Sequence, residues 1–196
     1  KDQVQAIGAV WYPGEEGGHA IAAVLFGDYN PAGRLPITYP LHEGQLPLVY
    51  NHKPTGRGDD YNNLSGLPLF PFGFGLSYTR FAYSDMKLDK NTIGAAGSTT
   101  VSFTIKNTGA RDGEEVVQLY IQDVLASVAR PVLELKGFQR VRLKAGETKT
   151  VAFSITPDML SMLDLQLNRV VEPGAFRVMV GGSSVDIRLK DTLTVH

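Results

Sequence analysis

Alternation of hydrophobic and polar residues dominates the second half of the chain. Between Ser98 and Lys106, the apolar residues Val101, Phe103 and Ile105 fall on one face, with the period of two that a half-buried strand shows. Comparable short segments recur along the chain at 115–122, 132–143, 150–155, 175–180 and 185–195. Roughly seven strands in about 115 residues indicate an antiparallel β-sandwich of immunoglobulin-like type.

Individual positions in this half carry more specific expectations. In the segment 132–143, Phe138, Val141 and Leu143 are expected in the core because they are the large apolar residues of a strand. Glu114 and Glu115 follow a turn cluster and are expected in solvent. The sandwich contains no catalytic triad and no pair of acids that has a reason to converge, so it is interpreted as a structural module.

The N-terminal stretch follows a different pattern. Residues 6–12 (AIGAVWY) form a nearly continuous apolar run, as expected for a strand covered on both faces. The segment 15–26 predicts a helix, with Gly27 as its C-cap. A single strand–helix unit cannot bury both faces of its strand, so this stretch is expected to end a larger α/β domain. The chain begins at Lys1 with few residues before the strand, which suggests a piece of a longer protein.

Two acidic residues stand between the predicted strand and helix. Glu15 and Glu16 would lie on a loop after the carboxyl end of the strand, the edge at which open α/β sheets bind ligands. The same residues would also complement the positive end of the helix dipole. Capping of the helix and a role at the rim of a ligand pocket both remain open at this point.

The segment 41–79 shows no clear period of 2 or 3.6 residues and is rich in Pro, Gly, Asn and Asp. Gly73 and Gly75 are expected to permit tight turns with positive φ rather than to bind a dinucleotide. The segment is not a flexible linker, because its large aromatic side chains need somewhere to bury: Tyr50, Tyr61, Phe70, Phe72, Phe74 and Tyr78. We expect an interdomain connector that packs over neighbouring domains.

Composition narrows the classes of function. The 19 basic and 20 acidic residues give a net charge of -1, which favours neither nucleic acid nor an anionic membrane as a partner. No apolar run approaches the roughly 20 residues that span a bilayer. The chain has no cysteine, and His42, His52 and His196 are scattered, so neither a metal site nor a cofactor is expected.

Several independent strings resemble one family of enzymes. The run 13–40 (PGEEGGHAIAAVLFGDYNPAGRLPITYP) resembles the closing part of the α/β sandwich domain of family 3 glycoside hydrolases, and 46–57 and 69–81 resemble further segments of their bacterial β-glucosidases. The strings 105–123 and 130–148 resemble the fibronectin type III-like domain that ends those enzymes. Two departures are visible: His19 stands where Asn is expected, and the loop from Gly58 to Leu67 is short.

The resemblance implies three parts: residues 1–40 as the end of the α/β domain, 41–79 as the connector and 80–196 as the fibronectin type III-like domain. It also implies a retaining β-glucosidase acting on a β-linked oligosaccharide or an aryl glucoside. Retention requires two carboxyl groups about 5–5.5 Å apart. In the family these are an Asp of an N-terminal barrel and a Glu that precedes this stretch, so no catalytic residue is expected in this chain.

Because the catalytic residues are expected elsewhere, we expect this chain to contribute only to the rim of the substrate pocket. The expected rim residues are Trp11, Glu15, Glu16, Tyr50, His52 and Arg57. The connector allows two interpretations. It is a packed interdomain link, or its part from Tyr50 to Arg57 reaches a sugar site of its own or of a neighbouring subunit.

Partners and location follow from the same resemblance. We expect contact with the upstream barrel and α/β domains, a homodimer through the connector and the sandwich, and a periplasmic or secreted protein. The alternative is a stand-alone module that binds carbohydrate or protein. Such a module needs an exposed aromatic platform, whereas the alternation places most aromatics of the sandwich toward its core: Tyr83, Phe103, Tyr120, Phe138, Phe153 and Phe176.

Overall fold

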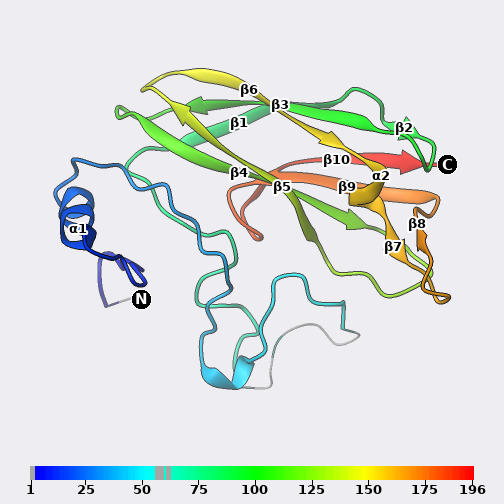
Figure 1. Ribbon diagram of the computed structural model, residues 1–196, viewed down its shortest axis with the longest axis horizontal. Coiled ribbons are helices and arrows are strands. Elements are labelled where there is room, and N and C mark those ends of the chain that lie inside the picture. Colours follow the sequence, from blue (N-terminus) through cyan, green and yellow to red (C-terminus); the bar gives the residue numbers. More distant parts are fainter. Residues whose placement is uncertain (1–2, 56–59, 61–62) are drawn as a thin grey trace.

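The computed structural model describes residues 3–55, 60 and 63–196. It is mainly β, as expected, and its strands build a sandwich of two sheets (Figure 1). The strands and helices in chain order are α1 (Gly17–Leu25), the 3-10 helix η1 (Glu43–Gln45), β1 (Phe81–Leu88), β2 (Thr92–Ile93), β3 (Thr99–Asn107), β4 (Gly113–Asp123), β5 (Glu134–Leu143), β6 (Thr148–Ile155), α2 (Pro157–Leu160), β7 (Met162–Leu163), β8 (Arg169–Val170), β9 (Gly174–Gly181) and β10 (Ile187–Val195).

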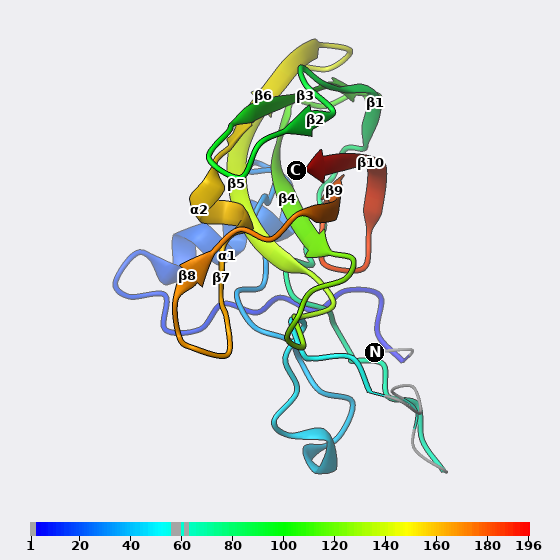
Figure 2. The ribbon, with the colours of Figure 1, turned by 90° about the vertical axis from the view of Figure 1, so that its right-hand side faces the viewer.

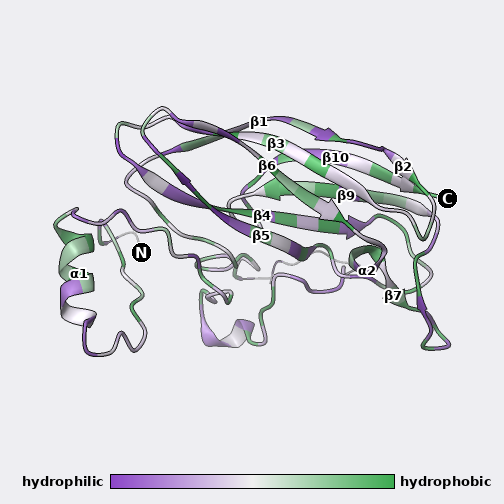
Figure 3. Cartoon of the chain, turned by 45° about the horizontal axis from the view of Figure 1, so that its top comes forward, coloured by the Kyte–Doolittle hydropathy of each residue, from purple (hydrophilic) through white to green (hydrophobic). Residues whose placement is uncertain are grey.

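One sheet has the strand order β1-β3-β6 and the other β2-β10-β9-β4-β5, while β7 and β8 form a separate small hairpin. All pairs are antiparallel except β2 with β10. The two sheets face each other in Figure 2, and Figure 3 shows hydrophobic residues along the strands of both sheets. The prediction of an immunoglobulin-like sandwich is therefore confirmed.

The core between the sheets follows the predicted alternation. Val101, Phe103 and Ile105 of β3 are all buried and pack against residues of the opposite sheet. Aromatic stacking extends this layer, because the Phe103 ring lies between Tyr83, at 6.0 Å between centroids, and Phe153, at 6.2 Å.

Two expectations for single positions in the sandwich were wrong. Phe138 is 68% exposed, because the period of two that turns Val141 and Leu143 inward places Phe138 on the outer face of the sheet. Glu115 is only 5% exposed, because it shares the inward face of β4 with the core residue Val117. Glu114 is partly exposed on the outer face and forms an ion pair with Arg140.

The N-terminal stretch forms its helix but not its strand. Residues 6–12 have no strand assignment, and Tyr12 is fully exposed. A strand requires a hydrogen-bonded neighbour, and the described residues provide none for this stretch. The predicted helix forms as α1, beginning at Gly17 rather than at Glu15, and Gly27 follows it with a φ of 82°.

The connector packs along the outer side of the sandwich instead of looping freely. Tyr39 pairs with Phe70, which brings the segment after α1 beside the second half of the connector. Figure 1 shows both segments running between α1 and the five-stranded sheet, with η1 at the far tip. Of the two glycines expected to have positive φ, Gly73 does, at 80°. Gly75 serves a close approach, since a Cβ there would lie 2.2 Å from the Gly33 carbonyl oxygen.

The residues that the structure describes include no helix with the length and apolar character needed to cross a membrane.

Candidate functional site

Trp11 is the first of the expected rim residues along the chain. Its backbone has a φ of 49°, a left-handed conformation that non-glycine residues rarely adopt. Its ring meets Tyr39 edge-on, with 6.3 Å between the centroids. The side chain is still 58% exposed, so one side of the indole is available to another part of the protein or to a ligand.

The two acids that precede α1 are both exposed. Glu16 occupies the N-cap position but makes no side-chain capping bond to the helix backbone. Its carboxylate instead lies 2.8 Å from Nδ1 of His19, on the first turn of the helix. His19 is the residue that stands where the family resemblance led us to expect Asn, so the departure from the family pattern contacts an expected rim residue directly.

Tyr50 and His52 lie together in the connector and line one cleft of about 420 Å³ against the sandwich. The Tyr50 ring stacks on Phe72 at 4.1 Å between centroids, and its hydroxyl accepts a hydrogen bond from the Leu135 amide. The His52 carbonyl accepts a bond from the Val132 amide. These contacts tie the connector to the start of β5. Arg57, the remaining rim residue, lies outside the described residues, as does Tyr61 of the connector.

The structure therefore does not gather the expected rim residues into one site. Tyr50 and His52 share a cleft that Trp11, Glu15 and Glu16 do not line. Glu15 and Glu16 directly precede α1, and Trp11 contacts Tyr39. The Tyr50 ring and the His52 carbonyl are used in contacts within the chain, whereas Trp11, Glu15 and Glu16 are exposed to solvent.

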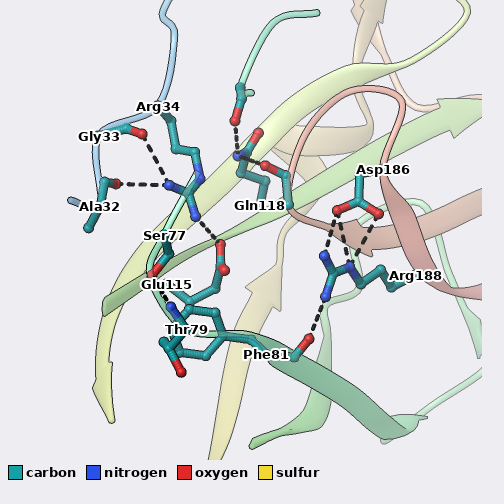
Figure 4. A network of polar contacts seen from close by, with 12 residues as sticks. Ala32, Gly33, Arg34, Ser77, Thr79, Phe81, Glu115, Gln118, Asp186 and Arg188 are labelled. Carbon is teal, nitrogen blue, oxygen red and sulfur yellow. Dashed lines mark hydrogen bonds and ion pairs between the residues drawn. The ribbon is translucent and has the colours of Figure 1, made fainter. Parts of the chain in front are cut away.

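An ion pair that the sequence did not reveal fastens the N-terminal segment to the sandwich (Figure 4). The guanidinium of Arg34 lies 2.7 Å from the carboxylate of Glu115, and the two side chains are only 10% and 6% exposed. Arg34 also donates hydrogen bonds to the carbonyl groups of Ala32 and Gly33. Burial raises the pKa of Glu115 above its ordinary value, and the positive charge of Arg34 opposes that rise.

Gln118 makes a second buried connection on the opposite face of β4. Its side-chain amide donates hydrogen bonds to the Gly73 carbonyl at 3.1 Å and to the Gly182 carbonyl at 2.6 Å. Its carbonyl oxygen accepts a bond of 2.5 Å from the Tyr120 hydroxyl. Gln118 is 2% exposed, so water cannot substitute for these partners without opening the interface.

Arg188 completes this polar cluster at the edge of the sandwich. It forms an ion pair with Asp186 at 2.8 Å, donates to the Phe81 carbonyl, and lies 5.0 Å from the centroid of the Tyr83 ring. Burial raises the pKa of the Tyr83 phenol above its ordinary value.

Residues just after α1 make further ties to the turn between β3 and β4. Asn30 donates to the Asp112 carbonyl at 2.9 Å, and Arg111 donates to the Gly27 carbonyl at 3.0 Å. The Tyr29 hydroxyl accepts a bond from Arg140. A second cleft of about 430 Å³ lies here, lined by Gly27, Tyr29, Asn30, Arg111 and Asp112 among others. Together with Arg34, these residues hold the segment 27–40 on the sandwich.

One signal in the sequence could have revealed part of this interface. Val117, Leu119 and Ile121 face the core, so the period of two required Glu115 to face inward as well. A buried glutamate requires a partner. The identity of that partner was not predictable, because Arg34 lies 81 positions earlier in the chain.

The chain's two halves match two known domain families. Residues 1–78 match the glycosyl hydrolase family 3 C-terminal domain, and residues 115–184 match the fibronectin type III-like domain. The fold and these matches define a class of protein, one in which the end of an α/β domain is joined to a β-sandwich. The chain belongs to glycoside hydrolase family 3 and corresponds to its C-terminal part.

Curated relatives cover nearly all of the chain. A periplasmic beta-glucosidase from Salmonella typhimurium is 45% identical in an alignment 196 residues long, gaps included, which covers 95% of this chain and 26% of the relative. A beta-xylosidase from Formosa agariphila is 48% identical in an alignment 199 residues long, gaps included, which covers 99% of this chain and 27% of the relative. The chain thus spans about a quarter of the length of these relatives.

Solved structures agree with the fold. The crystal structure of a beta-glucosidase from Listeria innocua in complex with glucose superposes with a TM-score of 0.91 at 40% identity, over 95% of this chain and 27% of that one. A family 3 beta-glucosidase from Bifidobacterium adolescentis superposes with a TM-score of 0.80 at 35% identity, over 95% of this chain and 29% of that one.

Proposed function

We propose that this chain is the C-terminal part of a retaining β-glucosidase that hydrolyses terminal β-D-glucosyl residues of oligosaccharides and aryl glucosides. The observation that carries the proposal is the match of both halves, in order, to the domains of family 3 glycoside hydrolases. The relatives include both a beta-glucosidase and a beta-xylosidase, so a β-xyloside is the natural competing substrate. The nucleophile and the acid/base are assigned to upstream domains.

In the complete enzyme, this chain would frame the active site rather than perform chemistry. We assign residues 1–40 to the α/β domain, 41–79 to the connector and 80–196 to the fibronectin type III-like domain. The match that ends at residue 78 and the start of β1 at Phe81 support the boundary between the connector and the fibronectin type III-like domain. The buried Arg34–Glu115 pair would hold residues 27–40 on the sandwich, and Gln118 would hold the connector there through Gly73.

The proposal predicts no glycosidase activity for the 196-residue chain by itself. Release of nitrophenol from aryl β-glucoside and aryl β-xyloside should be absent with this chain and present with the same chain extended through its upstream domains. Turnover by the purified chain would contradict the assignment of both catalytic carboxyl groups to upstream domains.

Glu16 is assigned to the pocket rim, where it would order the wall through hydrogen bonds such as the one with His19. In the extended enzyme, Glu16→Gln should lower kcat/KM by about tenfold, because a charge-assisted bond becomes a neutral one. Glu43→Gln, which changes an exposed acid of η1, is the matched control and should leave kcat/KM unchanged. Equal activity of Glu16→Gln and the parent would remove Glu16 from the rim.

We further propose a homodimer, with the connector and the sandwich at the interface. Exposed apolar side chains on these elements, including Leu67 of the connector and Leu125 after β4, support this assignment. Analytical ultracentrifugation of the full-length enzyme should give twice the mass of one chain. A monomer across the micromolar range would contradict the dimer without affecting the proposed activity.

Location is proposed as periplasmic or secreted, on the basis of the periplasmic beta-glucosidase from Salmonella typhimurium. The alternative function, a stand-alone binding module, has less support. Among the sandwich aromatics considered for a platform, only Phe138 is exposed, while Phe103, Tyr120 and Phe176 are buried.

A further inference from the structure

A continuous series of aromatic rings leads from Trp11 toward the sandwich. The Trp11 ring meets Tyr39 at 6.3 Å between centroids, and the Tyr39 ring meets Phe70 at 6.3 Å. Phe70 in turn stacks on Phe74 at 5.4 Å, with the two rings inclined by 21°. We call these four side chains, Trp11, Tyr39, Phe70 and Phe74, the ring series.

Backbone hydrogen bonds make the middle of the ring series rigid. The Tyr39 amide donates to the Phe70 carbonyl at 2.9 Å, and the Leu69 amide donates to the Tyr39 carbonyl at 2.8 Å. The Leu35 amide donates to the Phe74 carbonyl, and the Gly73 amide donates to the Leu35 carbonyl, both at 2.8 Å. The segments 35–39 and 69–74 therefore move together or not at all.

The far end of the ring series is held by the sandwich through Gln118. The Gln118 amide donates to the Gly73 carbonyl, next to Phe74, and to the Gly182 carbonyl between β9 and β10. The fit is close, because a Cβ at Gly73 would lie 2.2 Å from the Gln118 side-chain oxygen. The Ser184 amide supports the same turn by donating to the Phe72 carbonyl at 3.0 Å.

The near end of the ring series is a residue whose conformation needs support. Trp11 holds a φ of 49°, a conformation that costs free energy and persists only where the surrounding structure fixes it. Among the described residues, the ring contact recorded for its indole is the one with Tyr39. The position of the indole thus depends on Tyr39, and the position of Tyr39 depends on the turn that Gln118 holds.

We propose that Gln118 is a positioning residue for Trp11 and that, through the ring series, it sets the affinity of the pocket rim for a substrate sugar. This inference rests on the proposed function, since it takes Trp11 as part of the rim. It gives the sandwich, which lacks catalytic groups of its own, a defined effect on substrate binding. The sandwich acts on the rim by fixing one turn of the connector.

The experiment uses the full-length enzyme carrying 5-fluorotryptophan, with the fluorine resonance of Trp11 assigned through Trp11→Phe. Gln118→Met keeps the length of the side chain but removes both donors to the Gly73 and Gly182 carbonyls. We expect the Trp11 resonance to shift or broaden, and KM to rise about fivefold with kcat within twofold of the parent, as for a weakened stacking contact.

Gln122→Met is the matched control. Gln122 lies on the same face of β4, but its side chain pairs with Arg177 at the exposed end of the strand. This variant should change neither the resonance nor KM. A double-mutant cycle with Tyr39→Leu tests the route: if Gln118 acts through Tyr39, the two effects on KM are not additive.

Tyr120→Phe provides a milder variant if Gln118→Met fails to fold. It removes only the hydroxyl that donates to Gln118, and a smaller shift of the Trp11 resonance in the same direction would support the inference. If the Trp11 resonance is unchanged in both Gln118→Met and Tyr120→Phe, the inference that Gln118 positions Trp11 is overturned, whatever the activity of these variants. A shifted resonance with KM unchanged in Trp11→Ala would instead overturn the placement of Trp11 at the rim. Absence of any β-glycosidase activity in the parent enzyme would overturn the proposed function.

Discussion

Replacing Phe103 with alanine is expected to lower the free energy of unfolding of the sandwich by about 3–5 kcal/mol. Phe103 is 1% exposed, and its ring lies between those of Tyr83 and Phe153. The substitution removes the buried apolar surface and leaves a cavity between the two sheets, and the close-packed strands on either side limit how far the cavity can collapse. Hydrogen exchange of the β3 amides in the full-length protein would measure the loss.

Phe138→Ala is the matched control for this prediction. It deletes the same atoms from a strand of the same sandwich, but at a position that is 68% exposed. The expected change is within about 0.5 kcal/mol of the parent. Similar losses at the two positions would contradict the assignment of Phe103 to the core and of Phe138 to the outer face.

Phe103 and Phe138 show how far the period of two in the sequence predicts which side chains face the core. The period of two correctly placed Phe103 inward with its neighbours on β3. The same period, counted from Val141 and Leu143, puts Phe138 outward, so the grouping of all three in the core went against the pattern itself. The expectation for Phe138 rested on its hydrophobicity, whereas its position in the strand determines which face of the sheet it occupies.

The prediction of a strand over residues 6–12 was wrong for a different reason. Its apolar sequence is that of a buried strand, but strand formation depends on a neighbouring strand, and none of the described residues pairs with it. The contacts that hold residues 27–40 and the connector on the sandwich were also beyond prediction. Arg34 and Glu115, or Gln118 and Gly73, meet only because the whole chain has folded. Of the expected rim residues, the sequence located Tyr50 and His52 in one segment but could not indicate that packing would occupy the Tyr50 ring.

The other large effect is expected at the buried pair of Arg34 and Glu115. Arg34→Met removes the guanidinium and leaves the Glu115 carboxylate buried without its charge partner. Breaking a buried ion pair in this way costs about 3–5 kcal/mol, so hydrogen exchange of the β4 amides should accelerate strongly near neutral pH. The segment 27–40 should also lose protection, because Arg34 ties it to the sandwich.

The loss of stability caused by Arg34→Met should depend on pH, because Glu115 changes its protonation state with pH. Burial raises the pKa of Glu115 above the ordinary 4.5 and Arg34 opposes the rise, so the pKa rises further when Arg34 is lost. A carboxyl group whose pKa is raised on folding contributes stability that is fully present below its unfolded pKa and is lost as the pH rises through its folded pKa. The variant loses more of this contribution than the parent at neutral pH, and the difference should narrow as the pH falls toward 4.5.

The double variant Arg34→Met/Glu115→Leu separates the ion pair from simple packing. It removes both charges and fills the site with apolar atoms, a replacement that is often neutral or stabilising for a buried pair. We therefore expect protection of the β4 amides within about 1 kcal/mol of the parent, with the pH dependence from Glu115 abolished. If the double variant were as unstable as Arg34→Met, the loss would come from the missing hydrogen bonds of Arg34 to the Ala32 and Gly33 carbonyls rather than from an unpaired carboxylate. If the loss of stability in Arg34→Met stayed constant between neutral pH and about pH 5, the missing hydrogen bonds would likewise be its cause, rather than the unpaired carboxylate.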